Sequence, residues 1–261
     1  MKRLAVAAVV LVVVWIGGLI VSDYVLERSI RARVADRIGE SLRATATIAS
    51  GDLALVRGHE DLAGLSVVRD EPIGHLSLQV DEIRCELPPL GFALFDRSCG
   101  ELAVRGVHLS VSAAALFSFP RPKRPPMRAR SVVIDDATFD FAPSAFVPDL
   151  GRVSIRIDHA EAGPTVFKTP LSWLFALREL RATLSLPAGI GLALEYRAGT
   201  LTAAGSVLGS APVTIPVSLP VVTLADDARD ELRALGSFGK DIAERLVAEK
   251  ATDWLRSKLG G

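Results

Sequence analysis

The chain has 261 residues, and 30 basic residues balance 30 acidic ones, so its formal net charge is zero. Hydrophobic residues make up 49% of the chain, which excludes a disordered protein, and the balanced charge is not that of a basic nucleic-acid-binding protein. Its two cysteines exclude a disulfide-dense scaffold and a four-cysteine zinc site.

An apolar segment at the start of the chain predicts a transmembrane anchor within residues 1–22. Residues 4–22 contain no charged side chain and follow Lys2 and Arg3. A helix of this length spans roughly 28 Å, about the thickness of the hydrocarbon core. A cleaved signal peptide is the alternative, although the apolar run is long for one and no clear A-x-A site follows. Charge alone only slightly favours a cytoplasmic N-terminus, because arginines also follow the span closely.

The anchor is expected to continue as an amphipathic juxtamembrane helix over residues 23–43. Apolar residues recur every four positions from Leu26 to Leu42, and charged residues lie between them. Such a helix can pack against its own domain or bind a partner protein, and the pattern alone leaves both open.

Over residues 44–222 the hydrophobic period changes to two, which predicts about ten short β-strands. Nearly every strand has one apolar and one polar face, which favours an antiparallel sheet over buried parallel strands. Three strands contain a slip of one residue in this alternation, at Asp81-Glu82, Arg105-Gly106 and Asp135-Asp136. Each slip predicts a β-bulge that returns the apolar residues to the same face.

Few helices are available to cover the apolar face of such a sheet. A short helix is expected over residues 170–178, and a long amphipathic helix over residues 223–261, where Asp226 and Asp227 suit a helix N-terminus. An extended apolar face does not remain in contact with water. The sheet therefore either closes as a β-sandwich or curls into a half-open trough filled by apolar material such as acyl chains. Repeated bulges favour curvature.

Two further features each allow a structural and a functional interpretation. The proline-rich loop 119–130 is either a solvated connection or a contact for anionic lipid headgroups. Its basic residues are Arg121, Lys123, Arg124, Arg128 and Arg130. Cys85 and Cys99 flank a short segment between two predicted strands, and they form either a disulfide or two buried thiols.

Enzyme signatures are missing from the sequence. It contains no histidine pair with metal-binding spacing, no nucleophile elbow, no P-loop and no dinucleotide-binding fingerprint. The adjacent Asp135 and Asp136 suit a strained turn better than acid–base catalysis. We therefore expect a non-enzymatic protein with no catalytic residue, no metal, no cofactor and no nucleic-acid partner.

A basic start, one membrane span and a helix are followed by strand segments with a characteristic order. These segments are ASGDLALVRGHEDLAGLSVV, LSLQVDEIRCELPPLGFALFDRSCGELAVRGVHLSVS and SVVIDDATFDFAP. This arrangement, from residue 1 to about residue 143, resembles the N-terminal region of AsmA-like proteins. The shared motifs are patterns of small and apolar residues and not catalytic signatures.

The resemblance implies a single-pass inner-membrane protein with a cytoplasmic N-terminus and a body in the periplasm. It implies a mainly β fold: a curved antiparallel, taco-like and half-open sheet, with an N-terminal transmembrane and amphipathic helix and a C-terminal helix. It implies that a β-groove shields lipid tails, in phospholipid transport or outer-membrane homeostasis. An oxidising periplasm also favours the disulfide between Cys85 and Cys99.

In this interpretation a phospholipid or another acyl lipid would lie on the apolar strand faces, with its headgroup at the rim. The expected groove-lining residues are Leu78, Val80, Ile83, Val107, Leu109, Ile134, Phe139, Ile155 and Ile157. The alternative is an envelope assembly or scaffold factor with a closed β-sandwich body and an envelope protein as partner. In that protein the same residues would be ordinary core.

Overall fold

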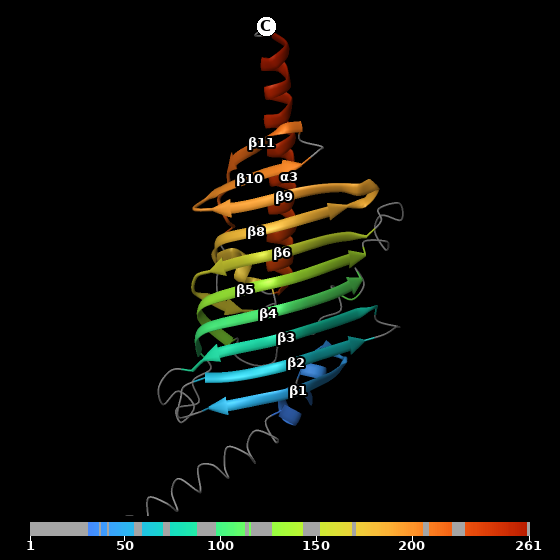
Figure 1. Cartoon of the computed structure of the whole chain (residues 1–261), viewed down its shortest axis with the longest axis vertical. Helices are drawn as coiled ribbons and strands as arrows, with labels where there is room; N and C mark the ends of the chain where they lie inside the picture. The colour runs from blue at the N-terminus through green and yellow to red at the C-terminus, as the bar shows by residue number, and fades with distance from the viewer. Residues whose placement is uncertain are drawn as a thin grey trace, which may run out of the picture.

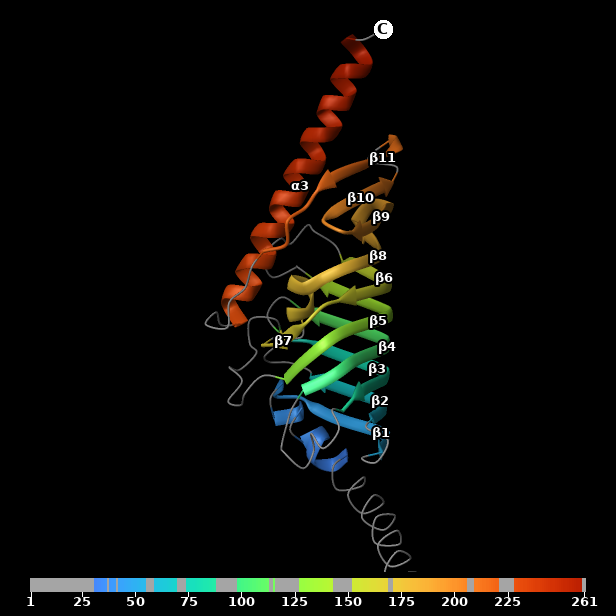
Figure 2. The same cartoon turned by 90° about the vertical axis from the view of Figure 1, so that its left-hand side faces the viewer.

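The structure is a computed structural model, and it describes residues 31–36, 38–40, 42–54, 59–69, 74–87, 98–112, 115, 127–142, 152–168, 171–205, 209–220 and 228–259. Within these ranges eleven β-strands form one sheet, and a long C-terminal helix lies along one side of it (Figures 1 and 2). The predicted mainly β class and the C-terminal helix are therefore confirmed. The predicted anchor lies outside the described residues, among which no helix is both long and apolar enough to cross a membrane.

The strands cross the sheet nearly in chain order. They are β1 (Thr45–Ala54), β2 (His59–Arg69), β3 (Leu76–Glu86), β4 (Ser98–Ser112), β5 (Met127–Ala142), β6 (Val153–Ala162), β7 (Thr165–Phe167), β8 (Leu177–Leu186), β9 (Ile190–Arg197), β10 (Thr200–Gly205) and β11 (Gly209–Pro216). The order in the sheet is β1-β2-β3-β4-β5-β6-β8-β9-β10-β11, and β7 pairs with β5. Neighbours in sequence are thus mostly neighbours in space, as short connections require.

Helical structure within the described residues lies mainly near the two ends of the chain. Residues 31–36 and 38–40 are helical, within the predicted juxtamembrane helix, and α3 (Ala228–Leu259) lies within the predicted C-terminal helix. The expected helix over residues 170–178 is shorter. It is the 3-10 helix η1 (Ser172–Ala176), and β8 already begins at Leu177. A second 3-10 turn, η2 (Pro187–Gly189), joins β8 to β9.

One strand pair departs from the expected antiparallel arrangement. β4 and β5 run parallel, with Val104 opposite Ile134 and Leu109 opposite Phe139. Residues 113–126 join them, and a parallel pair needs a longer connection than a hairpin. The prediction of an entirely antiparallel sheet was therefore wrong, because the alternation of apolar and polar residues does not encode strand direction.

The slips in the alternation lie in one row across the sheet. Gly64 in β2, Gly106 in β4 and Asp136 in β5 have left-handed φ angles of 65°, 63° and 52°. In every pair from β1–β2 to β5–β6, the register is the same on both sides of this row. The predicted bulges are therefore wrong in one respect: from β1 to β6 no strand gains a residue against its neighbour, because these strands all slip at the same row. Between β6 and β8 the register does shift at this row, between Ile157 and His159.

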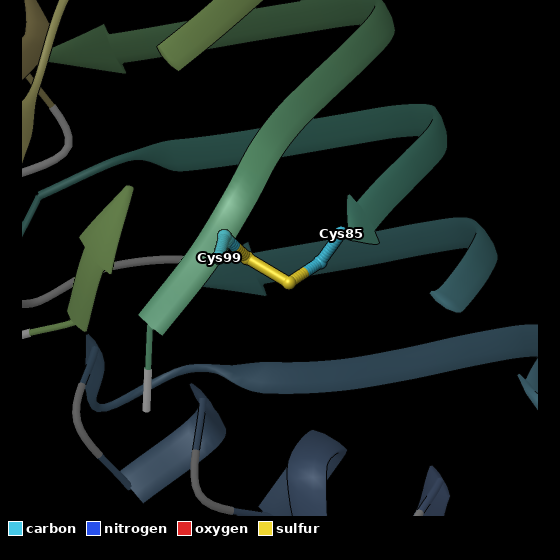
Figure 3. The surroundings of a disulfide bond; sticks show 2 residues. All are labelled: Cys85 and Cys99. Atoms are coloured by element: carbon cyan, nitrogen blue, oxygen red, sulfur yellow. A yellow bond between two sulfur atoms is a disulfide. The ribbon is translucent and has the colours of Figure 1, made fainter. Parts of the chain in front are cut away.

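The concerted slip keeps the apolar residues on one face, here called the inner face. Leu102 and Val107 lie on either side of the slip in β4, and both are buried; Val132 and Ala137 repeat this in β5. The strands that carry Cys85 and Cys99 bend strongly (Figure 3). The polar residues lie on the opposite, outer face.

At each edge strand of the sheet, an arginine side chain donates a hydrogen bond to a backbone carbonyl. Arg31 Nη1 donates to the carbonyl of Ala49 in β1 at 3.1 Å, and Arg245 Nη1, from α3, donates to that of Pro216 in β11 at 3.1 Å. Open strand edges can pair with other chains, so these bonds occupy acceptors that would otherwise invite such pairing.

A buried arginine joins the N-terminal helical segment to the sheet. The Arg69 side chain is 4% exposed and donates to the carbonyls of Leu42, Ala115 and Gly74 at 2.9, 3.2 and 3.3 Å. Burial, and then the charge of Arg43, lower the pKa of its guanidinium. Ile38 and Leu42 pack against the core next to this clamp, so the described part of the predicted juxtamembrane helix packs on its own domain.

Candidate functional site

Apolar residues of the inner face form continuous rows across neighbouring strands. Cross-strand pairing places one such row along β3, β4, β5, β6, β8 and β9. We call it the rim row; its members are Leu78, Leu109, Phe139, Ile155, Leu184 and Leu192. A parallel row, the central row, lies two residues along the same strands; its members are Val80, Val107, Ala137, Ile157, Ala182 and Leu194.

The two rows differ in their exposure to solvent. Five of the six central-row residues are buried, with Ala137 at 0% and Val107 at 7% exposed. No rim-row residue is fully buried, and Ile155 is 37% exposed. The rim row is therefore more exposed to solvent than the central row, and other inner-face residues such as Ile83 and Val104 are also half-buried.

The accessible apolar surface continues beyond the rim row. Phe141 lies opposite Val153, and Leu186 lies opposite Ile190, and all four are half-buried. They extend the rim row by two residues along β5, β6, β8 and β9. We call the rim row together with these four residues the apolar rim.

The structure divides the predicted groove-lining residues into two groups. Leu78, Leu109, Phe139 and Ile155 belong to the apolar rim. Of the others, four are buried in the core, and Ile83 is half-buried against it in the same way as Leu78, Leu109 and Phe139; the buried four are Val80, Val107, Ile134 and Ile157. The sequence pattern thus found the inner face in β3 to β6 but did not separate its accessible residues from its buried ones.

Sequence reasoning missed the part of the rim that comes from β8 and β9. Leu184, Leu186, Ile190 and Leu192 show the same alternation as the earlier strands. The alternation that marks an apolar strand face was therefore present in the sequence. The register of the strands adds that these residues continue the rim from Ile155, which lies opposite Leu184.

Charged residues on the outer face pair across the strands. Arg84 Nε donates to Asp61 Oδ1 at 2.8 Å, and this hydrogen bond raises the pKa of Arg84. His159 Nδ1 lies 2.7 Å from Asp135 Oδ1, a cross-strand pair that the sequence did not predict. Among the described residues, no group of three or more His, Cys, Asp and Glu side chains could hold a metal ion.

Of the predicted headgroup contacts, Arg128 and Arg130 are described. Both are exposed in β5, and they alternate with the buried Ala129, so they project from the outer face. Arg121, Lys123 and Arg124 lie outside the described residues. The apolar rim and the described arginines are therefore on opposite faces of the sheet.

A disulfide joins Cys85 and Cys99, with their Cα atoms 5.5 Å apart (Figure 3). It links the end of β3 to the start of β4, and Cys99 is 2% exposed within the core. Disulfides persist in oxidising compartments such as the periplasm.

A hollow of about 430 Å³ opens beside β1 to β4. Its charged lining residues are Asp52, Asp61, Asp81, Glu82 and Arg105. Such a lining does not suit an acyl chain, because the charged groups would lose their hydration. The apolar rim is therefore the better candidate for a functional site.

Comparison with known proteins adds no relative. No protein-family model matches the chain, and no curated protein matches it. The functional argument therefore depends on the geometry of the sheet.

Proposed function

We propose that the protein is a membrane-anchored lipid-binding protein of the periplasm that shields acyl chains on the inner face of its sheet. It would act in phospholipid transport or outer-membrane homeostasis. The observation that supports this most is the apolar rim, a continuous and solvent-accessible run of apolar side chains from β3 to β9. Its residues are half-buried except the exposed Ile155, and an apolar patch that solvent reaches supports a binding site.

The length of the rim suits an acyl chain. Five strand spacings separate β3 from β9 in the sheet, and at about 4.8 Å each they span roughly 24 Å. One leaflet of a bilayer core is roughly 15 Å thick. An acyl chain that lies across the strands therefore fits within the rim with length to spare.

The energetics suit a carrier more than a tight receptor. Each methylene that leaves water for an apolar surface gains about 0.8 kcal/mol. An acyl chain in a bilayer is already out of contact with water. Its transfer from the bilayer to the rim therefore changes the free energy little. The rim would thus lower the cost of crossing water without trapping the lipid.

Curvature and compartment agree with this proposal. The row of left-handed residues at Gly64, Gly106 and Asp136 bends the strands, which supports the half-open, taco-like trough. The disulfide supports an oxidising compartment, and the apolar segment 4–22 supports an anchor with the N-terminus in the cytoplasm. Arg121, Lys123 and Arg124 remain predicted headgroup contacts, whereas Arg128 and Arg130 lie in β5 on the face opposite the apolar rim.

A second candidate function is a non-enzymatic scaffold or assembly factor of the envelope with a closed β body. The burial of the central row favours it, because Val80, Ala137 and Ile157 already pack within the protein. In that case the apolar rim would bind an envelope protein and not a lipid.

Uptake of a phospholipid with a fluorescent acyl chain distinguishes the two functions. The full chain in unlabelled nanodiscs is mixed with vesicles that contain phosphatidylglycerol labelled in this way. Leu184→Asp places a charge in the rim, whereas Thr183→Asp places it on the outer face one residue away. We expect the wild type and Thr183→Asp to take up the labelled lipid. Leu184→Asp should lose this uptake while its unfolding midpoint stays equal to that of the wild type. Equal uptake by both variants, or none by the wild type, would contradict lipid binding.

A further inference from the structure

Helix α3 is attached to the sheet along a narrow stripe. It lies on the same side of the sheet as β7 and continues past β11 (Figure 2). Phe238, Ile242 and Leu246 pack against the core, and all three are only half-buried. They are four residues apart, so they form a single line on the helix. Val247, beside this line, is 69% exposed.

Within the described part of the chain, polar bonds at two points hold the helix beside this stripe. In its first turn, the carboxylate of Glu231 is buried at 2% exposure, and its oxygens lie 2.9 and 3.1 Å from Ser172 Oγ, which donates to them. The same hydroxyl accepts the backbone N–H of Lys168 at 3.1 Å. The second point is the exposed bond from Arg245 to the carbonyl of Pro216. We call the contact of Glu231 with Ser172 the latch.

The surface beside α3 continues the apolar rows described above. Leu194 of the central row lies opposite Ala203, which lies opposite Val213, and α3 contacts β11. The buried residues of these last strands are apolar; they are Leu201, Ala203, Val213 and Ile215. If α3 moved away, the apolar inner face would extend to the edge of the sheet.

Two glycines weaken the helix at the start of the stripe. Gly236 lies before Phe238, and Gly239 follows it. A Cβ atom at either position would meet nothing within 4 Å, so close packing does not require glycine there. Glycine lowers helix stability relative to alanine, so this segment is a weak point at which α3 can bend.

We propose that α3 is a strap that moves away from β11 when the latch opens, and so extends the apolar surface available to an acyl chain. The identity of what then binds rests on the proposed function, whereas the opening itself is a property of this chain alone. The half-buried stripe and the two glycines make this helix separable from the sheet once the Glu231–Ser172 contact that holds it is broken.

Amide hydrogen exchange on the full chain in nanodiscs tests the opening. We expect the amides of α3 to exchange much faster than those of β4 and β5. Ser172→Ala should accelerate exchange in α3 by roughly tenfold, because it removes the hydrogen bonds to the buried carboxyl group of Glu231, and it should leave β4 and β5 unchanged. Phe238→Ala should act in the same direction through the stripe. Ser185→Ala, at an exposed serine of β8, is the matched control.

The uptake of phosphatidylglycerol with a fluorescent acyl chain then tests what the opening does. Faster uptake by Ser172→Ala than by the wild type supports the strap. Protection of α3 equal to that of β4 and β5, with both variants changing all strands together, overturns it. Fast α3 exchange with equal uptake by Ser172→Ala and wild type overturns its role in lipid access. No uptake by any form contradicts the proposed function, and the exchange data alone then decide whether α3 opens.

Discussion

Substitution of Gly106 tests the row of left-handed residues that bends the sheet. Gly106 has a φ of 63°, and a Cβ atom there would collide with the carboxylate of Asp81 on β3. The left-handed conformation costs a residue with a Cβ roughly 1–2 kcal/mol, and displacement of Asp81 adds to this. We therefore expect Gly106→Ala to lower the free energy of unfolding by about 2 kcal/mol.

Urea unfolding of the full chain in detergent measures this effect, with the fluorescence of the buried Trp173 as the probe. The midpoint should fall without a change in slope. Adding Asp81→Ala to Gly106→Ala should recover the part that comes from the collision. Gly191→Ala is the matched control, because no atom lies within 4 Å of a Cβ at this strand glycine. If Gly106→Ala is as stable as Gly191→Ala, the reasoning about the bend is refuted.

Three further predictions concern other parts of the fold. The Cys85–Cys99 disulfide joins residues that are 14 positions apart, and its reduction should lower the free energy of unfolding by about 3 kcal/mol. Dithiothreitol should therefore lower the melting temperature of the wild type. It should not change the melting temperature of Cys85→Ser, which has no disulfide to reduce. Arg69→Met should make the segment near Leu42 more accessible to protease, because the carbonyl of Leu42 loses its 2.9 Å hydrogen bond from Arg69. If protease cleaves this segment at the same rate in the variant and in the wild type, the clamp is contradicted. Burial raises the pKa of Glu60, so the folded state binds this proton more tightly than the unfolded state does. Glu60→Gln should therefore be more stable than the wild type at neutral pH and lose this advantage at acidic pH. The urea midpoints of the two proteins measure this. A difference between these midpoints that is the same at neutral and at acidic pH would refute the prediction.

The sequence predicted the inner face well because alternation records which side of a strand is apolar. Leu78, Leu109, Phe139 and Ile155 were each assigned to it from their own strand, and the register places them in one row. Alternation holds no information on direction, so the parallel pairing of β4 with β5 could not be foreseen.

The accessible part of the inner face could not be predicted for a different reason. Val80 and Leu78 are two residues apart on one face, yet Val80 is buried and Leu78 is only half-buried. Alternation gives the two residues the same face and so holds no information on this difference. The alignment of Gly64, Gly106 and Asp136 likewise exists only once the register is known.

Photo-crosslinking in cells tests the central claim, that acyl chains lie on the apolar rim, most directly. A benzophenone amino acid replaces Leu192 in the rim, or the neighbouring exposed Ala193 on the other face, in the full chain. The account predicts that mass spectrometry finds a phospholipid adduct at position 192 and none at position 193. Equal lipid adducts at both positions, or a protein adduct alone at position 192, would contradict it.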